Sequence, residues 1–163
     1  MTDGGGGGEV ARRPALAEDR ELLYRLYATT RAREMALVGW TESEKEAFVR
    51  QQFTAQDSYY HQTWPAAAYD VVELFGEPIG RIYVDVRPGG VQLMEITLLP
   101  EFRGQGIGAA LIREVIAQAD GLNLPVRLFV EPTNPAQRLY ARLGFLFDED
   151  HGVYQLLTRP RSS

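Results

Sequence analysis

Three glycines at alternate positions, Gly104, Gly106 and Gly108, directly follow Arg103 and precede an amphipathic run. A surface built from glycine exposes its backbone, because no side chain stands between the amides and a ligand. If a helix starts here, its free N–H groups and its dipole favour an anion above the turn. Residues 103–108 therefore predict a cradle for a phosphate or pyrophosphate group.

Two other kinds of phosphate-binding loop can be compared with this segment. A Walker A loop ends in Gly-Lys-Ser/Thr, but the only lysine of the chain is Lys45, far upstream. A dinucleotide fold places Gly-x-Gly-x-x-Ala after the first strand of repeated βαβ units, and residues 104–109 fit that spacing. Three consecutive predicted strands precede the loop and no ribose-binding acid follows at the required place, which argues against a dinucleotide.

Composition excludes several chemistries. The chain has 163 residues, which suits one domain with a sizeable core, and we expect this domain over residues 9–158. The absence of cysteine excludes thiol nucleophiles, disulfides and thiolate metal sites. The only histidines are His61 and His151, so we expect neither a histidine metal site nor a Ser-His-Asp triad. A net charge of -5 and a pI of about 5.1 argue against nucleic acid as a partner.

The ends of the sequence differ from the middle. Five consecutive glycines at residues 4–8 predict a disordered tail over residues 1–8, and residues 159–163 are expected to fray. We find no apolar run long enough to span a membrane and no signal-peptide pattern. We therefore expect a cytoplasmic protein without a membrane partner, and the sequence leaves both a monomer and a homodimer open.

Hydrophobic periodicity predicts the elements of the first half. A short strand is expected over residues 9–13, followed by helices over about 17–33 and 42–60. Three strands follow over residues 69–74, 79–86 and 91–99, with turns at residues 76–78 and 87–90.

The second half begins with the clearest helix, over residues 106–121. Its apolar stripe consists of Ile107, Leu111, Ile112, Val115, Ile116 and Ala119. A strand over residues 126–130 precedes a helix that starts at Asn134-Pro135, runs through Leu143 and stops at Gly144. Two strands within residues 145–157 complete the order β-α-α-β-β-β-α-β-α-β-β.

Two segments resemble the signatures of the GNAT N-acetyltransferase superfamily. Residues 103–108 are similar to its acyl-coenzyme A signature Arg/Gln-x-x-Gly-x-Gly/Ala, and residues 136–145 to its second signature Ala-x-x-Leu-Tyr-x-x-x-Gly-Phe. The resemblance covers roughly residues 9–157, although the first half matches only in element order. It implies an α+β, three-layer GNAT fold with a mixed, mostly antiparallel sheet flanked by helices.

The resemblance also implies a reaction. Acetyl-CoA would be the co-substrate, and its acetyl group would move to a primary amine of a small molecule or a protein, with no metal involved. That chemistry needs a pyrophosphate anchor, a polarised thioester carbonyl, a base for the amine and an acid for the thiolate. A degenerate module that binds or senses acyl-CoA without turnover is the alternative from another functional class.

The resemblance assigns the coenzyme contacts to the strand end, the glycine loop and one later asparagine. Arg103 would add charge at the phosphates, or else form a surface ion pair with Glu101. Asn134 lies one position from the place of the family's asparagine, where Thr133 stands, so capping of the last helix competes with a coenzyme contact. The expected contacts are Leu98, Leu99, Arg103, Gly104, Gln105, Gly106, Ile107, Gly108, Ala109 and Asn134.

Leu98 and Leu99 enter this set through their backbone. In the family, the strand before the loop bulges and splays from its neighbour, and its freed N–H and C=O groups pair with the acetyl and pantetheine amides. The following proline is consistent with the end of a ladder. Core packing of both leucine side chains is the alternative, and one residue can do both.

The two catalytic candidates are Tyr140 and Glu95. Tyr140 of the second signature is implied as the acid, because a hydrogen-bonded phenol, titrating near 10, can protonate or stabilise a leaving thiolate whose acid titrates near 8.5. Glu95 interrupts an apolar strand and would share one face with Thr97 and Leu99 by alternation, unless a bulge intervenes. The alternatives are a core tyrosine and a solvated glutamate on an exposed sheet face.

The base and the acceptor pocket are the least determined parts of the site. Asp85, Glu73 and Glu131 are lesser candidates for the base, and an amine that arrives neutral would need none. Residues of the first half of the chain are expected to form the acceptor pocket. The net negative charge of the whole chain suits a cationic amine. Candidate wall residues are Trp40, Tyr59, Tyr60 and Trp64, each of which could instead belong to the core.

Overall fold

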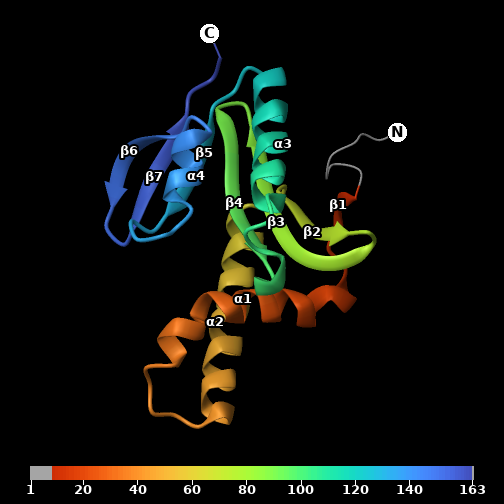
Figure 1. The fold of residues 1–163 in the computed structure, drawn as a ribbon, viewed down its shortest axis with the longest axis vertical. Helices are drawn as coiled ribbons and strands as arrows, with labels where there is room; N and C mark the ends of the chain where they lie inside the picture. The colour runs from red at the N-terminus through yellow and green to blue at the C-terminus, as the bar shows by residue number, and fades with distance from the viewer. Residues whose placement is uncertain (1–8, 163) are drawn as a thin grey trace.

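A computed structural model describes residues 9–162 of the chain as one seven-stranded sheet with helices on both faces (Figure 1). The tail predicted over residues 1–8 lies outside the described residues, as does Ser163. The strands are β1 (Val10–Pro14), β2 (Ala68–Leu74), β3 (Glu77–Arg87), β4 (Gly90–Leu98), β5 (Val126–Val130), β6 (Leu146–His151) and β7 (Tyr154–Arg159). The helices are α1 (Arg20–Met35), α2 (Glu42–Thr63), α3 (Ile107–Gly121) and α4 (Gln137–Arg142).

The strands lie in the order β1-β2-β3-β4-β5-β7-β6. Every neighbouring pair is antiparallel except β4 and β5, which run parallel. The predicted mixed, mostly antiparallel sheet and the predicted element order are therefore confirmed. No helix within residues 9–162 is long and apolar enough to cross a bilayer.

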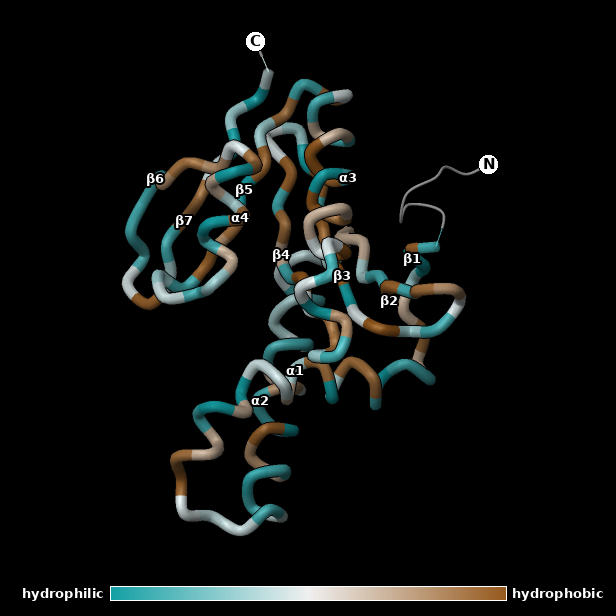
Figure 2. The backbone as a smooth tube through the Cα atoms, in the orientation of Figure 1, coloured by the Kyte–Doolittle hydropathy of each residue, from teal (hydrophilic) through white to brown (hydrophobic). Residues whose placement is uncertain are grey.

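Two hydrophobic cores lie on opposite faces of this sheet. On one face α3 buries the six-residue stripe predicted from its period, against side chains of β2 to β5 and β7. On the other face Leu26 of α1 and Phe53 of α2 pack with Val71 and Leu99 of the sheet side. The α1–α2 hairpin extends beyond the sheet (Figure 1, Figure 2), so only part of it covers strands. The fold is the three-layer arrangement that the resemblance implied.

A bulge in β4 decides which side chains reach the α1–α2 face. Tyr83 of β3 pairs with Glu95, but the next β3 residue pairs with Leu93, which leaves Met94 without a partner. Before the bulge, Val91 and Leu93 face the α3 core. The extra residue inverts the alternation, so Glu95 faces the opposite side, where α2 lies. Without the bulge, Glu95 would point into the α3 core.

Several predicted boundaries were wrong by a few residues, among them the start of α4, at Gln137 rather than at Asn134-Pro135, and the two that follow. The β2–β3 turn was expected at residues 76–78, but Phe75 and Gly76 are its two central residues, with φ of 51° and 81°, so β3 already begins at Glu77. Fraying was expected from Arg159, which is instead the last residue of β7 and pairs with Val126. Its Nε donates to the Leu143 carbonyl at 3.1 Å, which fixes this end of the chain.

The entry into α1 is fixed by a buried carboxylate. Asp19 is 6% exposed and accepts hydrogen bonds from the Arg13 guanidinium at 2.7 and 2.9 Å and from the Leu16 amide at 2.7 Å. The Arg13 contact lowers the pKa of Asp19 to about 2. Because the folded state favours the ionised form, this stabilisation is present above the unfolded pKa near 4 and disappears as pH falls through 2.

We therefore expect Asp19→Asn to lower the free energy of unfolding by about 2 kcal/mol at pH 7, and by much less near pH 2. Urea denaturation at the two pH values measures the difference. The exposed Glu114→Gln is the control and should change stability at neither pH. An equal loss for Asp19→Asn at both pH values would contradict the ionic origin of the effect.

Candidate active site

The loop between β4 and α3 has the backbone geometry of an anion cradle. Gly104 and Gly106 adopt φ of 74° and 84°, which L side chains rarely tolerate. A Cβ at either position would meet no atom within 4 Å, so the space above the loop is open. Gly106 is the N-cap of α3, and no side chain caps the helix start. The first-turn amides are therefore available, and the loop fits a pyrophosphate group.

Arg103 and Gln105 turn back to the protein rather than toward this space. Arg103 Nε donates to the Leu98 carbonyl at 2.9 Å, and its Nη2 donates to Thr29 Oγ1 of α1 at 2.9 Å. Gln105 Nε2 donates to the Glu101 carbonyl at 2.9 Å. Arg103 thus ties α1 to the end of β4, whereas its contact with a phosphate stays a prediction.

Strand β4, whose end is predicted to bind the pantetheine amides, has an edge without a partner strand after its first residues. β4 and β5 pair only at Val91 with Val126 and at Gln92 with Arg127, so the two strands part well before Leu98. Leu98 and Leu99 are both buried, and the Leu99 amide donates to the Ile79 carbonyl at 2.9 Å. The Leu99 amide is thus bound to β3 and the Leu98 carbonyl to Arg103, so the free edge of β4 belongs to the residues between Gln92 and Leu98.

Tyr140 lies in α4 with 7% of its surface exposed. Burial first, and the charge of Glu95 second, raise the pKa of its phenol to about 12. Its ring meets Phe145 edge-on with 5.7 Å between centroids, and Gly144 ends the helix with φ of 96°. Tyr140 is therefore both a core residue and a phenol that stays protonated at neutral pH.

Asn134 precedes α4 and binds the backbone there. Its Oδ1 accepts from the Ala136 amide at 2.8 Å, and its carbonyl accepts from the Gln137 amide at 3.1 Å. The helix proper begins at Gln137, so Asn134 closes the turn that leads into it. The N-cap of α4 is Ala136, and no side chain caps the helix, so the interpretation of Asn134 as the N-cap was wrong. Its contact with coenzyme A stays a prediction.

Glu95 is held by side chains from three elements. Tyr60 of α2 donates to its Oε1 at 2.9 Å, and Thr97 of β4 donates to its Oε2 at 3.1 Å. Arg81 Nη2 of β3 lies 3.4 Å from Oε2. About 20% of the Glu95 side chain stays exposed, so it is neither fully buried nor a freely solvated glutamate.

Comparison with known proteins identifies the family. The model of the acetyltransferase (GNAT) family matches residues 18–145. The chain belongs to the GNAT acetyltransferase family. PaiA N-acetyltransferase from Thermoplasma acidophilum, solved with coenzyme A, has a similar fold, with a TM-score of 0.70 and 18% identity over 94% of this chain and 99% of that one.

Two further proteins are similar to this chain. Arabidopsis thaliana Naa50, solved with the bisubstrate analogue CoA-Ac-MVNAL, shares the fold with a TM-score of 0.62 and 17% identity over 92% of this chain and 97% of that one. A Bacillus subtilis relative, provisionally named a ribosomal protein bS18-alanine N-acetyltransferase, is 33% identical over 94 residues. That match spans 55% of this chain and 62% of the relative.

Of the aromatic residues proposed for the acceptor wall of this GNAT chain, Tyr60 alone bonds to Glu95. Burial and the charge of Glu95 raise the pKa of Tyr60 far above its ordinary value, so it acts as a donor. Tyr59 is exposed beside it, with 6.2 Å between ring centroids. Trp40 packs edge-on against Phe48 in the α1–α2 hairpin, at 5.2 Å. The structure thus brings one of the four to the candidate base.

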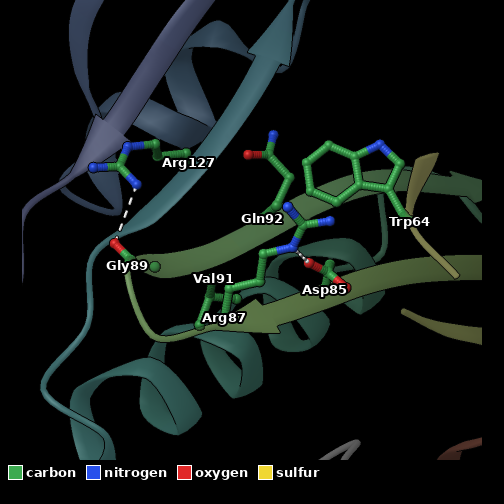
Figure 3. Close-up of a pocket in the computed structure, with 8 residues that line it drawn as sticks. Trp64, Asp85, Arg87, Gly89, Val91, Gln92 and Arg127 are labelled. Carbon is green, nitrogen blue, oxygen red and sulfur yellow. Dashed lines mark hydrogen bonds and ion pairs between the residues drawn. The ribbon is translucent and has the colours of Figure 1, made fainter. Parts of the chain in front are cut away.

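Trp64 belongs to a different place, a cavity of about 250 Å³ at the start of β4 (Figure 3). The Arg87 guanidinium lies over the Trp64 ring, 4.3 Å from its centroid, and pairs with Asp85 at 2.6 Å. The cavity lies at the opposite end of β4 from the glycine loop, and neither Glu95 nor Tyr140 lines it. We therefore do not assign it to acetyl transfer.

The lesser base candidates are dispersed. Asp85 is buried at that cavity, and Glu73 pairs with Arg13 at 2.8 Å on the β1 side of the sheet. Glu131 is exposed. Burial of the Tyr154 phenol is the largest cause that raises its pKa, and the charge of Glu131 is the second. Glu95 is thus the candidate with both partial exposure and a charge that acts on Tyr140.

Sequence reasoning missed two residues near Glu95. Arg81 could have been found, because polar residues alternate with apolar ones in β3 at Arg81, Tyr83 and Asp85, which predicts a polar inner face. Burial and the charge of Glu131 raise the pKa of Tyr154 at the start of β7, and the charge of Glu95 raises it to a smaller degree. No local pattern marks Tyr154, because only the tertiary fold brings it there.

Proposed function

We propose that this GNAT chain transfers the acetyl group of acetyl-CoA to a primary amine of a small molecule or a protein. The observation that carries the proposal is the arrangement around the free part of β4. An open backbone cradle follows its end, a clamped and partly exposed carboxylate stands on it, and the Tyr140 phenol lies within the field of that carboxylate.

Each group has a task in this proposal. Amides of residues 104–109 bind the pyrophosphate, and the free edge of β4 orients the pantetheine arm. The coenzyme supplies the thioester. Glu95 accepts a proton from the amine, directly or through a water, as the C–N bond forms. Tyr140 donates its proton to the thiolate as the C–S bond breaks, and its protonated state suits that task.

The test is an assay of free thiol with acetyl-CoA and a panel of amines. The panel contains polyamines, amino acids and peptides with free N-termini, because the Bacillus subtilis relative and Naa50 carry protein-related names. We expect thiol release that depends on the amine, and peptides are the acceptors to try first. Coenzyme A binding without thiol release would instead favour the non-catalytic module.

For the base, we expect Glu95→Gln to lower kcat by about 10²–10⁴-fold, because an amide cannot take up the proton. Its carbonyl oxygen still accepts from Tyr60, so the local packing is largely kept. The KM for acetyl-CoA should stay within about twofold. The control is Glu131→Gln at an exposed lesser candidate, which should keep wild-type kcat. A large loss of kcat in Glu131→Gln, with wild-type kcat in Glu95→Gln, would assign the base to Glu131 instead.

A further inference from the structure

Arg81 is the least exposed charged residue of the described chain, at 1%. It lies on β3 opposite Thr97, two pairs away from the pair of Tyr83 with Glu95, and faces α2. A guanidinium at this depth loses its water, which is costly unless partners replace it. Alternation along β3 predicts a polar residue on this face, but it does not require a full charge, so the charge of Arg81 needs an explanation.

The contacts of Arg81 are numerous but long. Its Nη2 lies 3.4 Å from Glu95 Oε2 and 3.3 Å from Gln56 Oε1, and its Nη1 lies 3.4 Å from the Tyr83 hydroxyl. Its Nε is buried with no hydrogen-bond partner among the described residues. Within residues 9–162, Glu95 is the only carboxylate that pairs with it. Bidentate geometry typical of a purely structural Arg–Glu pair is absent.

Glu95, in contrast, has short contacts and a free side. Tyr60 and Thr97 hold one carboxylate oxygen each, at 2.9 and 3.1 Å, and the bulge at Met94 turns the side chain to this face. These two hydroxyls orient the group but carry no charge. Among the described residues, Arg81 is the one cation that pairs with Glu95, and its Nη2 approaches the same oxygen that Thr97 holds.

We propose that Arg81 is a positioning residue for acetyl transfer, which holds the Glu95 carboxylate toward the acceptor amine without touching substrate itself. The inference rests on the proposed function, in which Glu95 takes the proton of the amine. It assigns the buried charge of β3 to the reaction rather than to the stability of the sheet. Gln56 and Tyr83 place the guanidinium, and Arg81 in turn acts only through Glu95.

A double-mutant cycle tests this assignment. Arg81→Met and Arg81→Lys are made in the wild-type chain and in Glu95→Gln, and kcat, both KM values and the Kd of coenzyme A are measured. We expect Arg81→Met to lower kcat by at least about tenfold in the wild-type background, with the Kd within about twofold. Arg81→Lys should restore part of that loss. In Glu95→Gln, Arg81→Met should have no further effect on kcat.

The same cycle shows when the inference is wrong. An equal factor of loss in both backgrounds, or wild-type kcat in Arg81→Met, would overturn it. If Arg81→Met loses its circular dichroism spectrum and its coenzyme A binding, Arg81→Gln replaces it in the cycle, since it removes the charge but keeps a donor. Failure of the proposed function is recognised separately, because the wild-type chain itself would then release no thiol with any amine.

Discussion

Gly106→Asp is expected to abolish coenzyme A binding, with a Kd raised by at least about 100-fold. The new carboxylate would stand in the open space above the cradle, where the pyrophosphate is proposed to lie. Two unit charges 4 Å apart repel by about 4 kcal/mol at an effective dielectric constant of 20, which corresponds to about 1000-fold in affinity. Isothermal titration with coenzyme A measures the loss.

A matched control separates this repulsion from backbone strain. Gly76 in the β2–β3 turn has φ of 81°, close to the 84° of Gly106, and a Cβ there also meets no atom within 4 Å. Gly76→Asp therefore carries similar strain and the same charge at another place in the fold. It should bind coenzyme A as the wild type does. Unchanged binding by Gly106→Asp would mean that the ligand lies elsewhere.

Tyr140→Phe is expected to lower kcat by about 10²–10⁴-fold, since no proton then reaches the leaving thiolate from this position. The ring contact with Phe145 is kept, so the Kd of coenzyme A should stay within about twofold. The control is Tyr59→Phe, which removes the hydroxyl of an exposed tyrosine and should leave turnover unchanged. Equal turnover in Tyr140→Phe would remove Tyr140 from the mechanism.

The pH dependence of kcat gives a second test of the role of Tyr140. Burial and the charge of Glu95 raise the pKa of Tyr140 to about 12, so its proton is retained well beyond the ordinary range of a phenol. The wild type should therefore show no alkaline loss of kcat between pH 8 and about pH 10 from this group. A fall with a midpoint near 10 would indicate a solvated phenol instead.

What could be predicted from the sequence depended on short-range order. The α3 stripe follows from its period, and Gly144 ends α4 because its φ of 96° suits glycine. The bulge at Met94 could not be predicted, since it exists only in the pairing of β4 with β3. Arg103 reaches Thr29, 74 residues away, and no local pattern encodes that contact.

The residues of the candidate site also fall into two groups, those that the local sequence marks and those that only the tertiary fold brings together. Glycines of the loop and the Tyr140 segment carry their own signature, so both could be found by inspection of the sequence. Glu95 is marked in the sequence as a break in an apolar strand, but the side chains that hold it come from α2, β3 and β4. The correct face for Glu95 depended on the bulge, which alternation alone cannot supply.

The brief contact between β4 and β5 has a consequence for which molecules can enter the sheet. An unpaired strand edge is ordinarily a liability, because a foreign chain can add to it and begin aggregation. Here the unpaired edge of β4 lies inside the sheet, between two sets of strands that meet at only two residue pairs. A polypeptide would have to wedge into that gap with side chains on both faces. A thin linear molecule with amides of its own can fill it as a substitute strand.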